Sequence, residues 1–101
     1  MHSLLILYPP QPDPEAFIRH YEEAHLALVR KNPGLKAFSY GFNLAAPDGE
    51  SPYSAVFEAN FASREALGAA MGSPEAHAAA ADVVNFASVQ PIVLTYPRQV
   101  G

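Results

Sequence analysis

Apolar residues repeat with two different periods along this chain, and each change of period marks a new element. Residues 3–8 are apolar on both faces of an extended segment, which is typical of a central strand covered on both sides. Residues 14–32 instead repeat with the helical period of about 100° per residue, so one stripe of the predicted helix is apolar. That stripe contains Phe17, Tyr21, Ala24, His25 and Leu28.

Residues with known end preferences bound this first helix. Asp13 can cap the first turn, and Pro14 fits the first helical position. Pro33 and Gly34 end the helix and lead into a strand. Leu26 lies off the apolar stripe, so we expect it to point away from the core. An exposed leucine there would leave open a contact that assembles more than two chains.

Two further strands follow the helix. Residues 36–44 and 53–61 alternate between apolar and polar positions, which predicts a strand in each segment. The segment between them contains Pro47, Asp48 and Gly49, a turn signal.

The last third of the chain predicts two short helices and a strand. Ser63 is expected to cap a helix that ends near Met71, and Ser73 to cap an alanine-rich second helix. Residues 89–96 form the final strand, and Pro91 within it indicates an edge position.

The resulting order, β-α-β-β-α-β, is the ferredoxin-like pattern of an α+β protein with a four-stranded antiparallel sheet. We expect one domain over residues 1–101. Helices can cover only one face of such a sheet, yet residues 4–7 and 93–94 supply apolar side chains to both faces. The sequence therefore predicts a homodimer in which two sheets pack face to face.

The composition indicates that a partner covers part of the apolar surface, and it argues against nucleic acid and a membrane span. Half of the residues are hydrophobic and only 16% are charged, against a typical value of about 25%. The net charge of −4 and the lack of a basic run argue against nucleic acid. The chain has no cysteine, and no apolar window approaches the roughly 18 residues of a membrane span. A cytoplasmic protein is expected.

His25 is the main candidate for chemistry, because it places a titratable imidazole on an apolar stripe. It can act as a general acid or base, or anchor a ligand between helix and sheet. It can also be a structural histidine bonded to a backbone carbonyl. Tyr21, one turn earlier, either orients a ligand or is a core tyrosine whose hydroxyl reaches water.

Asp82 follows the alanine-rich helix and has two open interpretations. It can pair with His25 across a pocket and set the tautomer of the imidazole. It can instead bond backbone amides at a turn. Asn85 suits a helix end, and Phe86 is a pocket wall or a core residue.

The remaining polar residues point to no other site. His20 and His77 are expected to be solvated. No pair of histidines lies at i, i+4 on one face, so no metal is expected, and no glycine-rich loop follows a strand, so no nucleotide or other cofactor is expected.

Small side chains in the alanine run either let helix and sheet approach closely or leave a space between them. Such a space would be apolar and suited to a small hydrophobic ligand. The residues expected to line it are Phe17, Leu28, Phe38, Tyr40, Phe57, Asn85 and Phe86.

Several short motifs, in this order and spacing, resemble the EthD family over nearly the whole chain. They are residues 5–8, residues 13–17 with Tyr21 and His25, residues 33–35, residues 53–57, residues 73–75, Asp82, and residues 85–87. The resemblance implies a ferredoxin-like unit that dimerises into an α+β barrel. It also implies a link to a bacterial system that degrades an alkyl ether alongside a cytochrome P450.

Three functions fit these observations. The first is a cofactor-free enzyme of the oxidoreductase, cyclase or isomerase type, acting on a small hydrophobic oxygenated compound by proton transfer at His25, with Tyr21 and Asp82 assisting. The second is a binding dimer that delivers such a compound to a partner oxygenase. The third is a structural dimer with a closed core.

Overall fold

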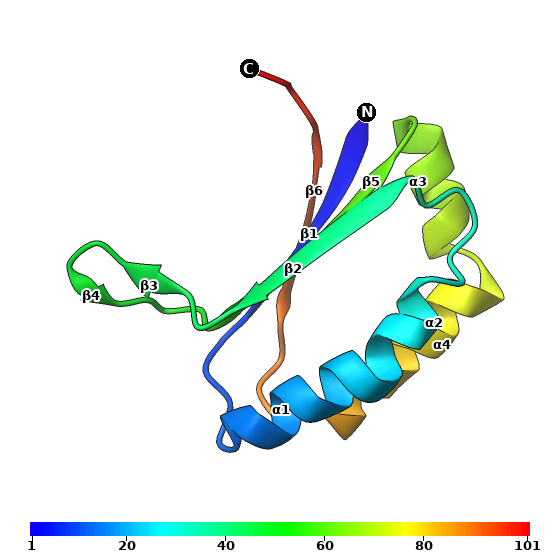
Figure 1. Cartoon of the computed structure of the whole chain (residues 1–101). Helices are drawn as coiled ribbons and strands as arrows, with labels where there is room; N and C mark the ends of the chain where they lie inside the picture. The colour runs from blue at the N-terminus through cyan, green and yellow to red at the C-terminus, as the bar shows by residue number, and fades with distance from the viewer.

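A four-stranded antiparallel sheet carries all of the helices on one face in the computed structural model, which describes residues 1–101 (Figure 1). The strand order is β2-β5-β1-β6, so β1 is interior and β6 lies at an edge. Both placements, and the α+β ferredoxin-like class, agree with the sequence prediction. The four strands are β1 (His2–Tyr8), β2 (Ala37–Phe42), β5 (Ala55–Phe61) and β6 (Ile92–Pro97).

The register of the strands decides which side chains face the helices. Ile6 of β1 lies opposite Phe57 of β5 and Val93 of β6. Directly opposed residues share a face of the sheet, so these three side chains point to the helical side. Leu7 lies opposite Val56 and Ile92, and this set occupies the other, open face.

The first helical segment is continuous but changes its winding. It consists of α1 (Pro14–His20), a π-helical turn (Tyr21–His25) and α2 (Leu26–Val29). Asp13 caps it as predicted, because its carboxylate accepts a hydrogen bond from the Ala16 amide at 3.1 Å. After the helix, Gly34 has a φ of +76°, a left-handed conformation that glycine adopts without strain.

The π-helical turn corrects two sequence predictions. A π turn holds one more residue than an α turn, so every later side chain is rotated from its expected direction. Leu26, expected to point away from the core, is only 2% exposed. Leu28, expected on the apolar stripe, is half-buried at the side of the helix. The reason for both differences is the same shift of phase.

Two further helices follow β5, namely α3 (Arg64–Met71) and α4 (Pro74–Asp82). The predicted caps are confirmed, because Ser63 accepts from the Ala66 amide and Ser73 from the Ala76 amide, each at 3.1 Å. A short 3₁₀ turn (Val83–Asn85) then extends α4. None of the helices has the length and apolar character needed to cross a bilayer.

Two details of the strands differ from the sequence prediction. Pro91 precedes β6 instead of lying within it, since a residue without an amide hydrogen cannot donate to the ladder. The predicted turn at 45–52 contains a small hairpin of β3 (Ala45–Ala46) and β4 (Gly49–Glu50). This hairpin projects away from the helices (Figure 1).

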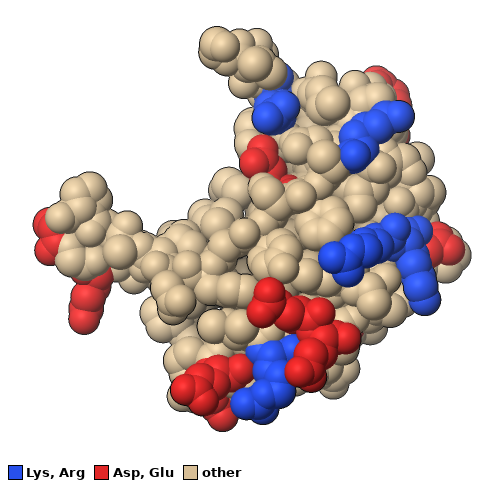
Figure 2. All heavy atoms as spheres, viewed as in Figure 1, with Lys and Arg blue, Asp and Glu red and all other residues tan.

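The open face of the sheet remains largely apolar and uncovered. Ile92 and Leu94 are among the exposed large hydrophobic residues of the chain. A smaller polar group shares this face, in which Tyr96 donates a hydrogen bond to Glu58 at 2.6 Å. Few charged atoms lie on the hollowed surface between the projecting hairpin and the C-terminal end (Figure 2).

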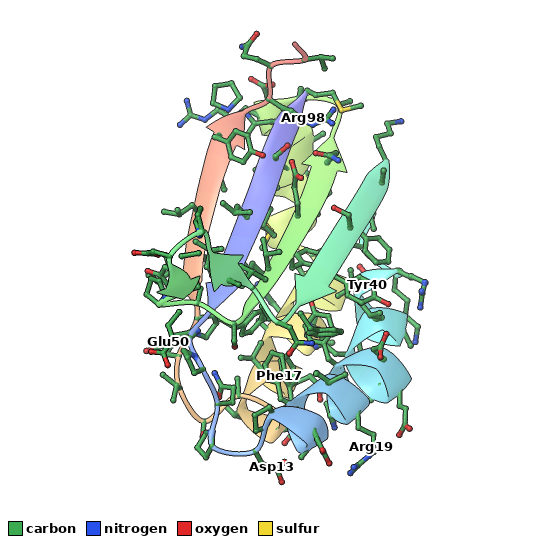
Figure 3. All side chains as sticks on the ribbon, turned by 60° about the vertical axis from the view of Figure 1, so that its left-hand side comes forward. Asp13, Phe17, Arg19, Tyr40, Glu50 and Arg98 are labelled. Carbon is green, nitrogen blue, oxygen red and sulfur yellow. The ribbon has the colours of Figure 1, made fainter.

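The helical face covers a core rich in aromatic rings. Phe17 points from α1 toward the sheet, whereas Arg19 points outward (Figure 3). The ring of Tyr8 packs edge-on against Phe17 and Tyr21, with centroids 5.2 and 5.9 Å apart. Phe86, from the chain after α4, joins the same cluster. One end of the helical layer is therefore filled by aromatic contacts.

A buried glutamine joins the two loops beside this cluster. The Gln11 amide donates to the carbonyls of Pro9 and Val89, and its oxygen accepts from the amides of Ser88 and Val89. All the polar groups of the side chain are thus satisfied.

Replacing Gln11 with alanine is expected to lower the free energy of unfolding by about 1–3 kcal/mol, because backbone groups lose their partners. Chemical denaturation measures this change. Gln90→Ala, at an exposed neighbouring position, is the control and should leave stability within about 0.5 kcal/mol. Equal stabilities of the two variants would contradict the role assigned to Gln11.

Candidate functional site

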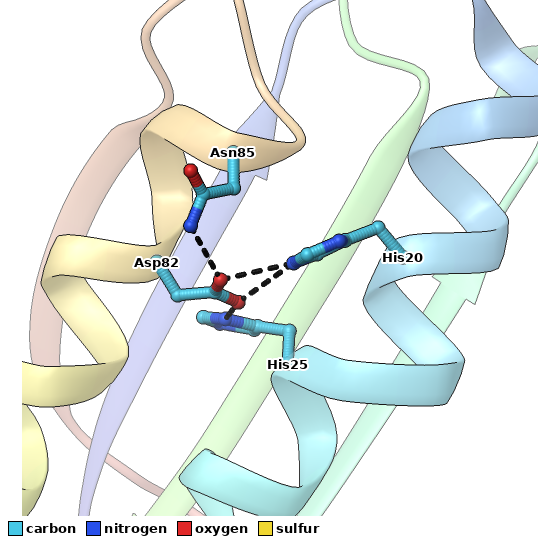
Figure 4. A network of polar contacts seen from close by, with 4 residues as sticks. All are labelled: His20, His25, Asp82 and Asn85. Atoms are coloured by element: carbon cyan, nitrogen blue, oxygen red, sulfur yellow. Dashed lines mark hydrogen bonds and ion pairs between the residues drawn. The ribbon is translucent and has the colours of Figure 1, made fainter.

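Asp82, near the end of α4, accepts hydrogen bonds from three side chains (Figure 4). His25 Nδ1 lies 2.9 Å from Asp82 Oδ2, and His20 Nε2 lies 2.9 Å from Oδ1. Asn85 Nδ2 donates to Oδ1 at 3.0 Å. The carboxylate therefore connects the first helical segment to the last one.

The chemistry of this carboxylate assigns the tautomer of His25. An ionised carboxylate only accepts hydrogen bonds, so the facing Nδ1 atom must carry the hydrogen. In a neutral imidazole the other nitrogen, Nε2, then holds the free lone pair. Nε2 makes no hydrogen bond within the chain. An imidazole held in this way has the arrangement of a general base.

The environment keeps both groups in these protonation states near neutral pH. Burial raises the pKa of the Asp82 carboxyl, but the hydrogen bonds from Asn85, His20 and His25 outweigh it, and the net pKa lies below its usual value. Burial lowers the pKa of His25, and the opposing effect of Asp82 does not reverse this. We therefore take Asp82 as charged and His25 as neutral.

Aromatic rings surround the two histidines. Phe86 lies against both of them, with centroids 4.6 Å from His25 and 5.5 Å from His20. The ring of Tyr21 lies 5.2 Å from His25. His25 is 4% exposed as a result. The imidazole is held in place by packing on its faces and by Asp82 at its edge.

An apolar cavity of about 150 Å³ lies between the helices and the sheet, and His25 is part of its wall. Eighteen residues line it and 15 of them are hydrophobic. The small side chains of Ala76, Ala79 and Ala80 form the wall on α4. The alanine run thus leaves a space, one of the two outcomes left open by the sequence.

Two phenols also line this cavity. Burial raises the pKa of Tyr8 to about 12. Burial, together with the neighbouring Tyr8, raises the pKa of Tyr21 even further. Both hydroxyls therefore remain protonated and can donate hydrogen bonds. The Tyr8 hydroxyl is buried, and no group meets the strict distance and angle criteria of a hydrogen bond to it. The Tyr21 side chain is its nearest hydrogen-bonding neighbour and lowers the pKa of Tyr8 slightly against the effect of burial.

The structure brings together only part of the predicted set. Tyr21, His25 and Phe57 line the cavity, and Asp82 lies behind His25. Phe17 and Phe86 pack beside the site in the aromatic cluster. The other predicted ligand-binding residues lie outside the cavity wall: Leu28, Phe38, Tyr40 and Asn85.

Two of the residues outside the cavity have other contacts. Tyr40 is partly exposed and donates to Glu22 at 3.1 Å. Phe38 lies under the guanidinium of Arg30, 5.5 Å from its carbon. Both lie on β2, which is the edge strand away from the cavity-lining β6. The sequence pattern gives the face of a strand but not its distance from the site.

Three polar residues of the site were missed or misplaced. His20, expected to be solvated, has a side chain that is 32% exposed but is also bonded to Asp82, a contact that was missed because α4 lies 62 residues away in the chain. Tyr8 and Asn32 were not singled out, but both line the cavity. Tyr8 alternates with Leu4 and Ile6 on β1, which is the signal that identifies its direction.

The acidic and imidazole groups do not form a metal site. No group of three or more His, Cys, Asp or Glu side chains is arranged to hold a metal ion. The three residues around Asp82 are joined to it by hydrogen bonds instead.

The His25 imidazole is expected to titrate below its ordinary pKa of 6.5. The negative charge of Asp82 stabilises the protonated imidazole, so its removal in Asp82→Asn is expected to lower the pKa of His25 further. NMR titration of the ring protons measures both midpoints. Asp48→Asn, in the distant hairpin, is the control. A wild-type midpoint at or above 6.5, or a rise in Asp82→Asn, would contradict this account.

The same shift has a consequence for stability. The unfolded chain binds the His25 proton more readily than the folded chain, so this contribution to stability is fully present above pH 6.5 and lost as the pH falls toward the folded pKa. Asp82 acts in the same direction at lower pH, because its pKa in the folded chain lies below the ordinary value of 3.8.

The chain matches proteins whose sequences and structures are known. Residues 9–90 match the EthD domain model. An uncharacterized 11.0 kDa protein from the thcB–thcC intergenic region of Rhodococcus erythropolis is 40% identical over 89 residues, or 87% of this chain and 85% of that protein.

Solved structures extend the likeness to the fold. An EthD family protein of Bacillus halodurans superposes with a TM-score of 0.92 at 30% identity, over 98% of this chain and 99% of the other. A dimeric ferredoxin-like protein of unknown function from Jannaschia has a TM-score of 0.74 at 19% identity, over 96% and 98% of the two chains. The family match covers most of the chain and agrees with the fold, and the protein therefore belongs to the EthD family.

Proposed function

We propose that this protein binds a small hydrophobic compound that carries a carbonyl group, and moves a proton at the carbon beside that carbonyl. The observation that carries the proposal is the hydrogen bond of 2.9 Å between His25 Nδ1 and Asp82, because it leaves a neutral imidazole with a free Nε2 lone pair in the wall of an apolar cavity.

In this reaction His25 Nε2 takes a proton from the α-carbon of the ligand. The electron pair of the broken C–H bond moves into the carbonyl, which becomes an enolate. Asp82 stabilises the imidazolium that forms and keeps it in place. Return of the proton from Nε2 to carbon restores the starting state of the protein.

The tyrosines supply the group that an enolate needs. A developing negative charge on oxygen is stabilised by hydrogen-bond donors that are already in place. The hydroxyls of Tyr8 and Tyr21 stay protonated because burial raises both pKa values.

The size of the cavity restricts the ligand. An apolar cavity of roughly 150 Å³ accommodates a molecule of about the size of benzene. Acetophenone, with one ring, one carbonyl and an adjacent methyl group, is therefore a suitable probe of the reaction without being the natural substrate.

Exchange of the acetophenone methyl protons in D₂O tests the proton transfer. The wild-type protein is expected to accelerate exchange over buffer, and His25→Gln to reduce that acceleration by about 10²–10⁴-fold, the usual contribution of a general base. Proton NMR follows the methyl signal. His77→Gln, at an exposed position of α4, is the control, and an undiminished rate in His25→Gln would contradict the mechanism.

Filling the cavity separates ligand access from the histidine itself. Ala79→Leu places a larger side chain in the wall of the cavity and is expected to return the exchange rate to background. Ala78→Leu, exposed on the same helix, should keep the wild-type rate. If Ala79→Leu exchanges normally, the reaction does not use this cavity.

Binding without turnover is the second candidate. The neutral phenols and the buried imidazole also suit a protein that carries a carbonyl compound to a partner oxygenase. Tight binding of a ligand with no exchange above background, in the protein alone, would favour that function over catalysis.

We also propose that the protein acts as a homodimer that uses the open face of the sheet. The exposed Ile92 and Leu94 on that face, together with Leu7 and Val56, support this assembly. A relative of the same fold is described as dimeric. A stable pair usually buries about 800 Å² on each partner.

Leu94→Arg is expected to convert the dimer to a monomer, because it places a charge at the centre of an apolar contact. Sedimentation equilibrium measures the assembly. Val84→Arg, on the exposed 3₁₀ turn after α4, is the control and should remain dimeric. A wild-type monomer would overturn the proposed assembly, as would a Leu94→Arg dimer of unchanged affinity.

A further inference from the structure

The cavity beside His25 has a mouth, which three exposed residues of its wall locate. They are Met71 at the end of α3, Ala80 on α4 and Val93 on β6. The side chains of Met71 and Val93 are large and apolar, yet these residues are 41% and 54% exposed. A residue that borders both the cavity and the solvent lies where the two meet. The rim of the mouth is therefore formed by α3, α4 and β6.

The mouth exists because the helical layer does not reach across the whole sheet. Phe57, Ile6 and Val93 lie opposite one another in β5, β1 and β6, so they form one row on the helical face. Phe57 is 3% exposed, Ile6 is half-buried and Val93 is 54% exposed. Since β6 is an edge strand, no further strand covers that side. The helices thus cover β5 and leave β6 open.

The wall of the cavity suits an uncharged molecule. None of its 18 residues is Asp, Glu, Lys or Arg, and 15 are hydrophobic. A charged group of a ligand would lose its hydration there without gaining an ion-pair partner. The exposed apolar surface at the mouth favours the opposite kind of group, because an apolar chain that covers Met71 and Val93 removes surface from water on both sides of the contact.

We propose that the ligand is an uncharged carbonyl compound with a linear apolar chain, which holds its carbonyl end beside His25 and passes its chain through the mouth over Ala80 and Val93. This inference rests on the proposed function and names the ligand class of the same site. The cavity itself holds a group of about the size of one ring, so a longer molecule must extend through the mouth. Ala80 and Val93 are specificity residues in this arrangement, since they touch the chain and not the reacting carbon.

A pair of probes that differ only in the chain tests this arrangement. Acetophenone fits within the cavity, whereas 4′-butylacetophenone adds a linear chain on the side of the ring opposite the carbonyl. A methylene group that leaves water completely strengthens binding about fourfold, and a chain in the mouth stays partly in water. The wild-type protein is therefore expected to bind the butyl probe about tenfold more tightly. Equilibrium dialysis measures both affinities.

Ala80→Phe fills the mouth from the side of α4. Acetophenone is expected to bind still, whereas the preference for the butyl probe is expected to vanish, because the chain has no surface on which to lie. Ala78→Phe is the matched control, since Ala78 is exposed on the same helix but does not line the cavity. It should keep the preference of the wild-type protein.

Val93→Asp changes the other side of the mouth by placing a carboxylate against the chain. The preference is expected to vanish in this variant as well. Thr95→Asp is its control, because Thr95 is exposed on the same face of β6 but lies outside the cavity wall. Each result is a ratio between two probes on one variant, so a general loss of stability cancels from it.

Equal affinities of the two probes for the wild-type protein would overturn the proposal. So would a preference that survives in both Ala80→Phe and Val93→Asp, or one that is lost equally in the two controls. These outcomes are separate from the fate of the proton transfer. Normal methyl exchange without a preference refutes only the path of the chain, whereas a clear preference without exchange refutes only the chemistry at His25.

Discussion

The arrangement of the site depends on the hydrogen bond between His25 and Asp82. It joins residues that are 57 positions apart and connects the first helical segment with the end of α4. Because the carboxylate also holds His20 and Asn85, one negative charge orients three side chains from two elements. Removal of that charge would leave these three side chains without the acceptor that they share.

The second constraint on this protein is the size of the side chains on α4. Alanines at positions 76, 79 and 80 are too small to fill the distance between helix and sheet, while Phe57 and Val93 do not extend across it. The aromatic cluster around Tyr8 borders the same cavity through Tyr8 and Tyr21. The buried cluster and the cavity thus share one layer, because the small side chains of α4 do not fill the space beside these rings.

The two faces of the sheet differ in what covers them. The helical face contains the buried cluster and the polar site, whereas the open face combines aliphatic residues with the Glu58–Tyr96 pair. Residues from β1 supply both faces, since successive side chains of a strand point in opposite directions. A substitution at an even-numbered position from Leu4 to Tyr8 therefore changes the cavity wall, whereas one at Leu5 or Leu7 changes the open face.

Local physical preferences in the sequence determined most of the fold. The caps at Asp13, Ser63 and Ser73, the period of the apolar residues and the order of helices and strands along the chain needed no distant contacts to be predicted. His25 and Tyr21 were identifiable because polar atoms on an apolar stripe need partners.

The tertiary structure alone decided the phase of the helix after Tyr21, the role of His20, and the separation of Phe38 and Tyr40 from the cavity. No periodicity indicates a π turn in advance, so Leu26 and Leu28 were assigned to the wrong directions. The remaining differences have one cause. A hydrogen bond or a cavity wall depends on distances between elements far apart in the chain, and those distances are set by packing and not by local sequence.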